Sequence, residues 1–317
     1  MAIIGTVYDD VFHTMVNDCG QLTIPVVNEM FQKKYQLTEE VTFLKNEHFL
    51  QNQAEEGERI TDSCVQLQGE KYHMECQSRP DGSMSERMFE YDSCIALEGS
   101  VLENHVLDIK FPHSGILYLR STSGTPDRLA VRLHTTGDDA TYYMPIMKVK
   151  DYDLDKIFHK ELYFLIPFYL FTFENRFAKM ESDEEQLGML KEEYADILKR
   201  LEAVVSVGRM NEFTKWCIIE MTRKVAENLA VNYEKVRKGV LDVMGGRILS
   251  YEAKDILFKG RQEGRQEGRQ EGFQEKAMIC YLNAVSRGMS HEDAMAIAEL
   301  TEEETRKAVD LRRNGKI

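Results

Sequence analysis

Residues Ile60 to Gln77, ITDSCVQLQGEKYHMECQ, contain the pattern that decides the expected fold. Gln68-Gly69 is typical of a two-residue hairpin loop, because glycine supplies the positive φ that the favoured hairpin turns need. The loop pairs Leu67 with Glu70, and this register sorts the side chains onto two faces. The apolar face, expected to pack on a core, carries Val65, Leu67, Tyr72, Met74 and Cys76. The polar face carries Asp62, Gln66, Lys71, His73, Glu75 and Gln77.

The polar face is expected to bring two carboxylates together. Asp62 falls opposite Glu75, and directly opposed residues have Cβ atoms roughly 5 Å apart. Like charges at that distance are unfavourable unless a cation or a raised pKa relieves them. A divalent metal such as magnesium suits carboxylate oxygens and keeps several waters for chemistry. The alternative is a solvated polar face on which Lys71 is a partial neutraliser.

The composition is that of an ordinary globular protein. The 317 residues are 43% hydrophobic and 30% charged, which gives room for one large core or two smaller units. Met1 to Val7 is too short for a signal peptide and lacks a basic start, and the apolar run Leu162 to Phe173 is too short to span a bilayer. The cysteines show neither CxxC nor zinc spacing, which favours reduced thiols in a cytoplasmic protein: Cys19, Cys64, Cys76, Cys94, Cys217 and Cys280.

The net charge of −14 argues against a generic polyanion binder. It does not exclude a nuclease, because an acidic metal site requires carboxylates and a local basic strip can hold phosphate.

Turn signals and periodicity predict a mixed α/β order. Asp9 to about Lys34 reads as helical, and a second helix begins at Ser83, where Ser83 to Glu86 has the form of a capping box. Strands are expected at Val41–Leu50, Arg59–Leu67, Lys71–Arg79, His105–Phe111, Gly115–Arg120, Leu129–His134 and Tyr142–Val149. From Asp151 onward helices dominate, and the aromatic segment Leu154 to Phe177 is expected to pack on the sheet.

A four-residue repeat, Gly-Arg-Gln-Glu, runs through residues 260–275. Its glycines weaken a helix, and its arginines would be like-charge i,i+4 neighbours within one helix. The repeat is either a self-association element or tether, or a flexible charged linker. Three short helices follow in residues 276–317, capped at Ser290 and Thr301. They resemble a helix-turn-helix, although glutamates at the start of the third helix favour a packing or interaction module.

Asp62 followed by Glu75-Cys76-Gln77 resembles the metal-binding signature of the PD-(D/E)XK nuclease superfamily, with Gln77 in place of the usual lysine. The chain is similar to the branch known as recombination-promoting or transposase-associated nucleases. The resemblance also covers Tyr8-Asp-Asp-Val-Phe, the stretch Met147 to Leu154, Leu165-Ile-Pro-Phe and the late repeats.

The resemblance implies a restriction-endonuclease-like αβββαβ core in residues 1–150, with a helical region at 151–259 packed on it. It also implies Mg²⁺ or Mn²⁺ held by Asp62 and Glu75, joined by Glu29 from the first core helix and the backbone carbonyl of Cys76. Gln77 can orient a water by hydrogen bonding but lacks the charge of an ammonium group.

Arg87 and Tyr91 match residues that recur on the helix after the third strand of this family. With Lys71, they are the expected contacts to the phosphate backbone, although Arg87 could equally form a salt bridge with a core carboxylate. The expected function is a metal-dependent DNA endonuclease linked to recombination or a mobile element. The expected partners are DNA and a possible second copy of the chain, with neither a membrane nor a small-molecule cofactor. The alternative is a catalytically weak or inactive transposase-like protein that acts through DNA or protein binding.

Overall fold

In the computed structural model, the described residues are 6–44, 47–50, 57–60, 63–79, 82–245, 277–286, 288–298 and 300–313. The chain divides into two compact units, Met1–Gly246 and Arg247–Ile317. The first unit contains the expected core at 1–150 and most of the expected helical region at 151–259. The Gly-Arg-Gln-Glu repeat at 260–275 lies outside the described residues.

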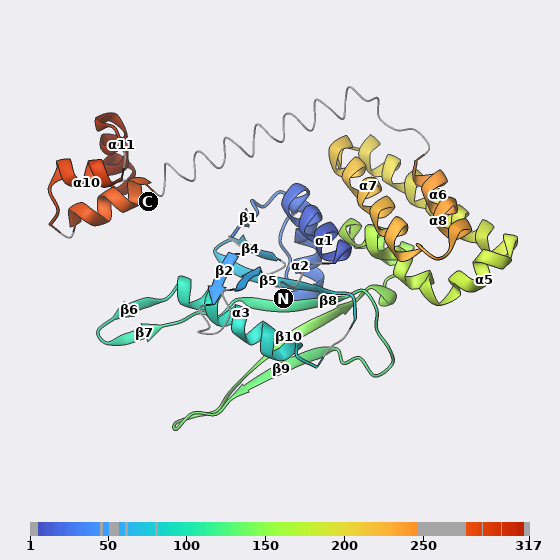
Figure 1. Ribbon diagram of the computed structural model, residues 1–317, viewed down its shortest axis with the longest axis horizontal. Coiled ribbons are helices and arrows are strands. Elements are labelled where there is room, and N and C mark those ends of the chain that lie inside the picture. Colours follow the sequence, from blue (N-terminus) through green and yellow to red (C-terminus); the bar gives the residue numbers. More distant parts are fainter. Residues whose placement is uncertain are drawn as a thin grey trace. The chain divides into compact units, whose positions relative to one another are not determined.

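A six-stranded mixed sheet forms the centre of the first unit (Figure 1). From one edge to the other its strands are β1 (Thr42–Phe43), β4 (Ser63–Leu67), β5 (Glu70–Gln77), β8 (His113–Tyr118), β10 (Ala140–Lys148) and β9 (Arg128–Leu133). Neighbours β1, β4 and β5 are antiparallel, β8 is parallel to both β5 and β10, and β9 is antiparallel to β10. The chain passes from β5 to the parallel strand β8 by way of helix α3 (Met84–Glu98). The predicted mixed α/β class is confirmed at this level.

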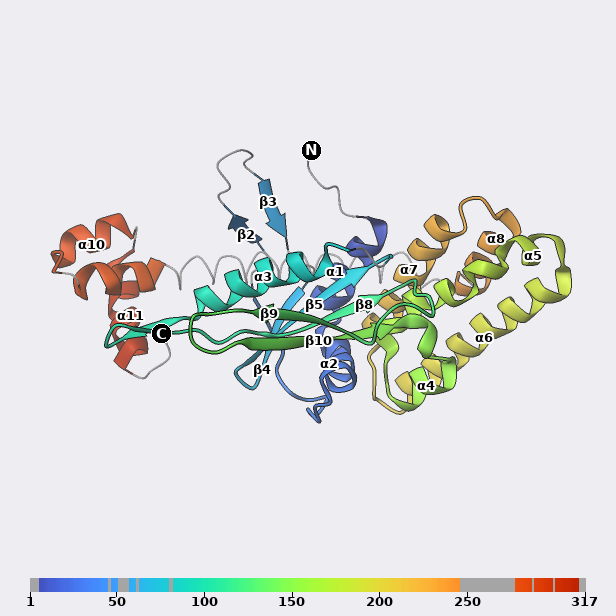
Figure 2. The same cartoon turned by 90° about the horizontal axis from the view of Figure 1, so that it is seen from below.

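Helices cover both faces of the sheet (Figure 2). On one face, α1 (Val7–Asp18) and α2 (Thr23–Phe31), joined by the 3-10 turn η1 (Gly20–Leu22), pack on the apolar side of the β4–β5 hairpin. That side is buried as predicted, with exposed fractions of 1% or less for Val65, Leu67, Tyr72, Met74 and Cys76. On the other face, Met84 and Met88 of α3 pack against Ile116, Tyr118 and Met144. The sheet therefore has a core on each side.

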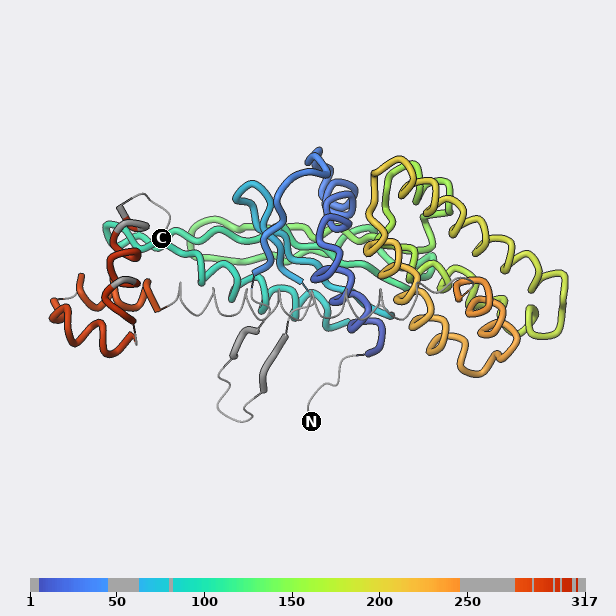
Figure 3. Tube along the Cα trace, turned by 90° about the horizontal axis from the view of Figure 1, so that it is seen from above, coloured from blue at the N-terminus to red at the C-terminus, as the bar shows by residue number. Residues whose placement is uncertain are grey.

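A helical region follows the sheet in the first unit, and Figure 3 traces it from green to orange. Its elements are η2 (Val149–Asp151), α4 (Leu154–His159), η3 (Tyr163–Arg176), α5 (Phe177–Ser182), α6 (Glu184–Ser206), α7 (Glu212–Leu229) and α8 (Glu234–Met244). The aromatic segment is buried in the main core, as predicted, but its 3-10 helix η3, with Pro167 inside, packs chiefly on helix α7 rather than on the sheet. Proline has no backbone N–H to donate, so it does not favour a regular α-helix there. Among the described residues, no helix is long and apolar enough to cross a membrane.

Several predicted boundaries are wrong. Val41–Leu50 is two strands, β1 and β2 (Glu47–Leu50), and β2 pairs with β3 (Gly57–Ile60) in a separate two-stranded sheet. The strand expected at His105–Phe111 is instead half of a hairpin, β6 (Val101–Glu103) and β7 (Val106–Asp108). The capping box at Ser83 does not form, because the Ser83 backbone is already αR rather than extended, and its side chain makes no cap hydrogen bond.

The described residues of the second unit form three short helices, at 277–286, α10 (His291–Ile297) and α11 (Glu302–Arg313). Small and apolar side chains form its core, among them Met278, Tyr281, Leu282, Ala294 and Ala308. The predicted caps are present: Ser290 accepts from the Asp293 N–H, and Thr301 and Glu304 bond reciprocally.

Candidate functional site

The candidate site is built on the β4–β5 hairpin. Gln68 and Gly69 have φ values of 49° and 83°, which are the paired left-handed conformations of a two-residue hairpin turn. The register runs from Leu67–Glu70 at the turn to Ser63–Met74, as predicted. Asp62, the residue expected opposite Glu75, lies outside the described residues. The Asp62–Glu75 pair therefore stays a prediction, one step beyond the described ladder.

The polar face of this hairpin is largely buried where α3 covers it. His73 is completely buried, and Glu75 is only 2% exposed. The neighbouring parallel strand places Ile116 beside Glu75, and Ile116 belongs to the apolar cluster under α3. The expected alternative of a fully solvated polar face is thus wrong for His73 and Glu75.

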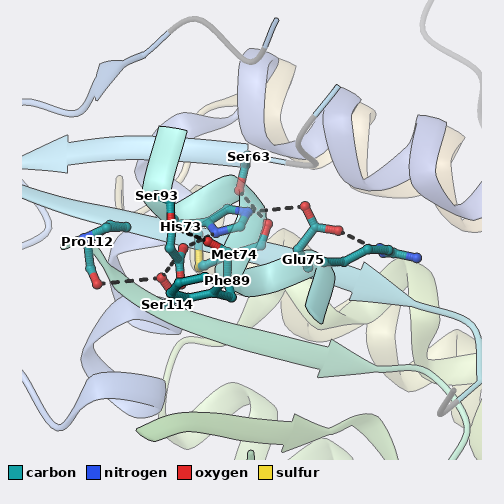
Figure 4. Close-up of polar contacts among 10 residues, drawn as sticks. Ser63, His73, Met74, Glu75, Phe89, Ser93, Pro112 and Ser114 are labelled. Atoms are coloured by element: carbon teal, nitrogen blue, oxygen red, sulfur yellow. Dashed lines mark hydrogen bonds and ion pairs between the residues drawn. The ribbon is translucent and has the colours of Figure 1, made fainter. Parts of the chain in front are cut away.

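Four charged side chains form a connected cluster at this place, which we call the charge network: His73 and Glu75 from β5, and Arg87 and Asp92 from α3 (Figure 4). The His73 Nδ1 lies 2.7 Å from Asp92 Oδ1, and its Nε2 lies 3.1 Å from Glu75 Oε1. Arg87 Nη2 donates to the other Glu75 oxygen at 3.2 Å. Both oxygens of Glu75 are therefore held by cationic groups.

The charge network reaches β8 through a serine. Ser114 donates its hydroxyl hydrogen to Asp92 Oδ1 at 2.6 Å, and it is 5% exposed. Tyr142 of β10 lies near the same carboxylate, and burial raises the pKa of its hydroxyl, with Asp92 adding to the rise. Through its hydrogen bonds to His73 and Ser114, Asp92 thus connects α3 to strands β5 and β8.

The surroundings of His73 determine its charge. Burial alone would lower the pKa of His73, but the hydrogen bonds to Asp92 and Glu75 outweigh burial and raise the pKa to about 9. Each ring nitrogen faces a carboxylate acceptor, so both nitrogens donate, as only the imidazolium form can. With His73 and Arg87 positive and Glu75 and Asp92 negative, the charge network has no net charge at pH 7.

For two further side chains, His13 and Cys64, burial is the largest cause of the pKa shift. It lowers the pKa of His13 on α1, although the Glu75 charge partly opposes the change. Burial raises the pKa of the Cys64 thiol, which faces His73 across the ladder, to about 12. A thiol with so high a pKa is protonated at neutral pH and is a poor nucleophile.

The predicted site residues on β5 lie on two faces. Gln77, two residues beyond Glu75 on the same face, is partly exposed at the end of the strand. Cys76 points its side chain into the core on the opposite face. Lys71 lies toward the turn and donates a hydrogen bond to the Ile95 carbonyl at 3.1 Å. Its positive charge is favourable there, because it lies at the C-terminal end of α3.

The predicted residues on helices have well-defined contacts. Arg87 forms a salt bridge with Glu75, which was the second of its two expected roles, and its side chain is still 29% exposed. Tyr91 is buried, and its ring meets the His73 ring edge to face at 5.9 Å between centroids. Glu29 on α2 accepts hydrogen bonds from Lys160 at 2.7 and 2.8 Å and from the Tyr152 hydroxyl at 3.0 Å.

Asp92 and Ser114 are residues of the charge network and its surroundings that the sequence pattern does not indicate, and the pattern places His73 only on the polar face. One signal was available for His73: it stands two residues before Glu75, so both share a face of the strand. Asp92 and Ser114 gave no comparable signal, because their contacts to β5 depend on how α3 and β8 pack.

A metal centre requires several ligating side chains close together. Among the described residues, no group of three or more His, Cys, Asp or Glu side chains could hold a metal ion. Glu75 can still bind a metal although it is already hydrogen-bonded, because a carboxylate has about four lone-pair sites. Ligating carboxylates are commonly held by further hydrogen bonds such as those from His73 and Arg87. A metal site here thus depends on Asp62.

Comparison with known proteins adds no relative to this geometry: no family model matches the chain, and neither a curated protein nor a solved structure is significantly similar to it.

Proposed function

We propose that this chain is a metal-dependent nuclease of the PD-(D/E)XK type, with Asp62 and Glu75 as its metal ligands. The observation that carries the proposal is Glu75: a nearly buried carboxylate held through both oxygens, on the strand whose register leads to Asp62. The order of elements supports it. Apart from the two separate hairpins β2–β3 and β6–β7, the chain order is helix α2, strands β1, β4 and β5, helix α3 and the parallel strand β8, as an αβββαβ core would require.

Several described residues would have a specific role in such a site. His73 and Arg87 fix the orientation of the Glu75 carboxylate, and Asp92 in turn fixes His73. A magnesium ion, when bound, would supply a water of lowered pKa as the attacking group. Gln77 can orient a water by donating or accepting a hydrogen bond. The Arg87 guanidinium, which pairs with Glu75 and is partly exposed, could also contact a phosphate oxygen.

A second candidate is a protein that binds DNA or a partner with little or no cleavage. Two observations favour it: Gln77 replaces the lysine of the resembled signature, and Glu75 already makes ion pairs with two cations. The two candidates differ in whether the protein cleaves DNA, so a cleavage assay distinguishes them.

The test is cleavage of supercoiled plasmid and of single-stranded DNA in Mg²⁺, in Mn²⁺ and in EDTA. We expect metal-dependent cleavage by the wild type and none by Glu75→Gln. Glu70→Gln is the matched control, because it makes the same change on the same strand at a surface residue paired with Lys110. Glu29→Gln tests the expectation that Glu29 is a further metal ligand. Because Glu29 forms an ion pair with Lys160, we expect cleavage to continue in this variant.

Asp62→Ala is the second diagnostic variant, because it removes the other proposed metal ligand. Loss of cleavage in a folded Asp62→Ala protein supports the proposal. Cleavage that survives both Asp62→Ala and Glu75→Gln, or a folded wild type that does not cleave in either metal, contradicts it and favours the second candidate.

A further inference from the structure

The β6–β7 hairpin projects from the first unit directly after α3 (Figures 1 and 3). It forms its own two-stranded sheet and does not join the six-stranded one. Its turn residues, Asn104 and His105, have φ values of 49° and 65°, the conformations of a two-residue turn that matches the natural strand twist. The hairpin is therefore an ordered ribbon with defined faces.

Large apolar side chains are exposed along this ribbon to an unusual degree. Leu102 is 70% exposed, Val106 65% and Val101 53%, and Leu97, Leu107 and Ile109 are also exposed. Other exposed apolar residues in the described chain are spread over several elements. Contiguous exposed apolar surface commonly marks an interaction site, and an isolated two-stranded hairpin is only marginally stable in water. Both facts indicate that a partner covers this ribbon.

The register shows which face a partner would cover. Leu102 pairs with Leu107, and the flanking pairs are Val101–Asp108 and Glu103–Val106. Paired residues share a face and successive pairs alternate, so Leu102 and Leu107 lie on one face. We call this the leucine face. The exposed Ile109 follows directly after the end of β7. The opposite face mixes Val101 and Val106 with the carboxylates of Glu103 and Asp108.

The charge of the ribbon argues against some classes of partner. Residues 97–109 contain three carboxylates, Glu98, Glu103 and Asp108, and neither lysine nor arginine. Such a surface repels nucleic acid and anionic lipid. An isologous contact between two copies places one patch against itself, so the patch must complement itself. The leucine face meets that condition, because it carries apolar groups alone and directs the carboxylates away from the contact.

We propose that the leucine faces of two copies of this chain pack against each other, making the β6–β7 hairpin a self-association surface. The contact buries Leu102 and Leu107 of both copies and leaves Glu103 and Asp108 in solvent. This proposal is independent of the nuclease proposal, since a dimer with no cleavage and a cleaving monomer are both measurable results.

The experiment is sedimentation equilibrium of the full-length protein over a concentration series. We expect the wild type to move from the mass of one chain to twice that mass. The double variant Leu102→Thr/Leu107→Thr keeps residues that favour strands but removes the apolar contact, so we expect its dissociation constant to rise by at least about tenfold. The matched control is Val101→Thr/Val106→Thr, which makes the same kind of change on the opposite face and should dimerise like the wild type.

The outcomes separate the ribbon from other routes to self-association. A wild type that stays monomeric at all concentrations overturns the proposal. A leucine-face variant that dimerises as well as the wild type also overturns it and assigns association to another part of the chain, such as the repeat at 260–275. Equal weakening by both double variants shows that the ribbon's integrity rather than the leucine face is responsible, and this too contradicts the proposal. Circular dichroism of each variant checks that the rest of the protein is folded.

Discussion

The charge of His73 predicts how the stability of the first unit depends on pH. The pKa of His73 is raised from 6.5 to about 9 in the folded protein, because its bonds to Asp92 and Glu75 outweigh burial. Below pH 6.5 the imidazole is protonated in both the folded and the unfolded chain, so its full stabilising contribution is present. As the pH rises through the folded value, that contribution is lost.

The size of the effect follows from the shift. About 2.5 pKa units at 1.36 kcal/mol each correspond to roughly 3 kcal/mol, lost mainly between pH 6.5 and 9. In that window, the free energy of unfolding should fall by up to about 1.4 kcal/mol per pH unit from this group.

Two assays check this prediction. Urea unfolding in EDTA at a series of pH values gives the free energy of unfolding. The fluorescence of Trp216, the only tryptophan of the chain, reports the unfolding, because this residue lies on α7 of the first unit. Nuclear magnetic resonance of the imidazole nitrogens, with His73→Gln to assign the signal, gives the charge of His73 directly. A neutral His73 at pH 7.5, together with a stability that is flat between pH 6.5 and 9, would refute the reasoning.

Two further substitutions test the packing around the site. Gly115→Ala on β8 places a Cβ against the Met30 sulfur and 3.1 Å from Phe31, so overpacking should lower the free energy of unfolding by roughly 1–3 kcal/mol in urea. An unchanged unfolding midpoint would contradict the close approach of α2 to β8. Arg120→Lys loses the two-bond contact to Glu174, with N···O distances of 2.5 and 2.7 Å, and the stacking on Phe171, so we expect a loss of roughly 1–2 kcal/mol in the same assay. A loss near zero would show that this pair does not stabilise the contact between η3 and the segment after β8.

The parts of the fold that could be predicted from sequence depend on local pattern. The β4–β5 register followed from one glycine turn and strict alternation, and the caps at Ser290 and Thr301 followed from residues three positions apart. The β6–β7 hairpin was missed because its turn is Asn104-His105, and histidine is not a usual residue for a left-handed turn position. Without that signal, the segment 105–111 read as one strand.

The candidate site could be predicted only in part, because it is assembled by long-range packing. Its position on β5 and the presence of Glu75 were visible in the sequence, and so was the option of an Arg87 salt bridge. The partner of His73 was not, since Asp92 reaches it only when the methionine stripe of α3 packs on Ile116 and its neighbours. Alternation along a strand tells which residues share a face but not what covers that face.

The neutral charge network determines how a Glu75 variant must be interpreted. Removing one member of a buried ion pair leaves the others uncompensated, which typically costs 3–5 kcal/mol. Glu75→Ala would remove the acceptors of both His73 and Arg87, whereas Glu75→Gln keeps the shape and one acceptor oxygen. The imidazolium can also relieve the excess positive charge by losing its proton, which Arg87 cannot do. Thermal stability should therefore fall in the order wild type, Glu75→Gln, Glu75→Ala. Activity lost in proportion to that order reflects unfolding, and only a loss that is already complete in the folded Glu75→Gln protein identifies Glu75 as a residue of the reaction.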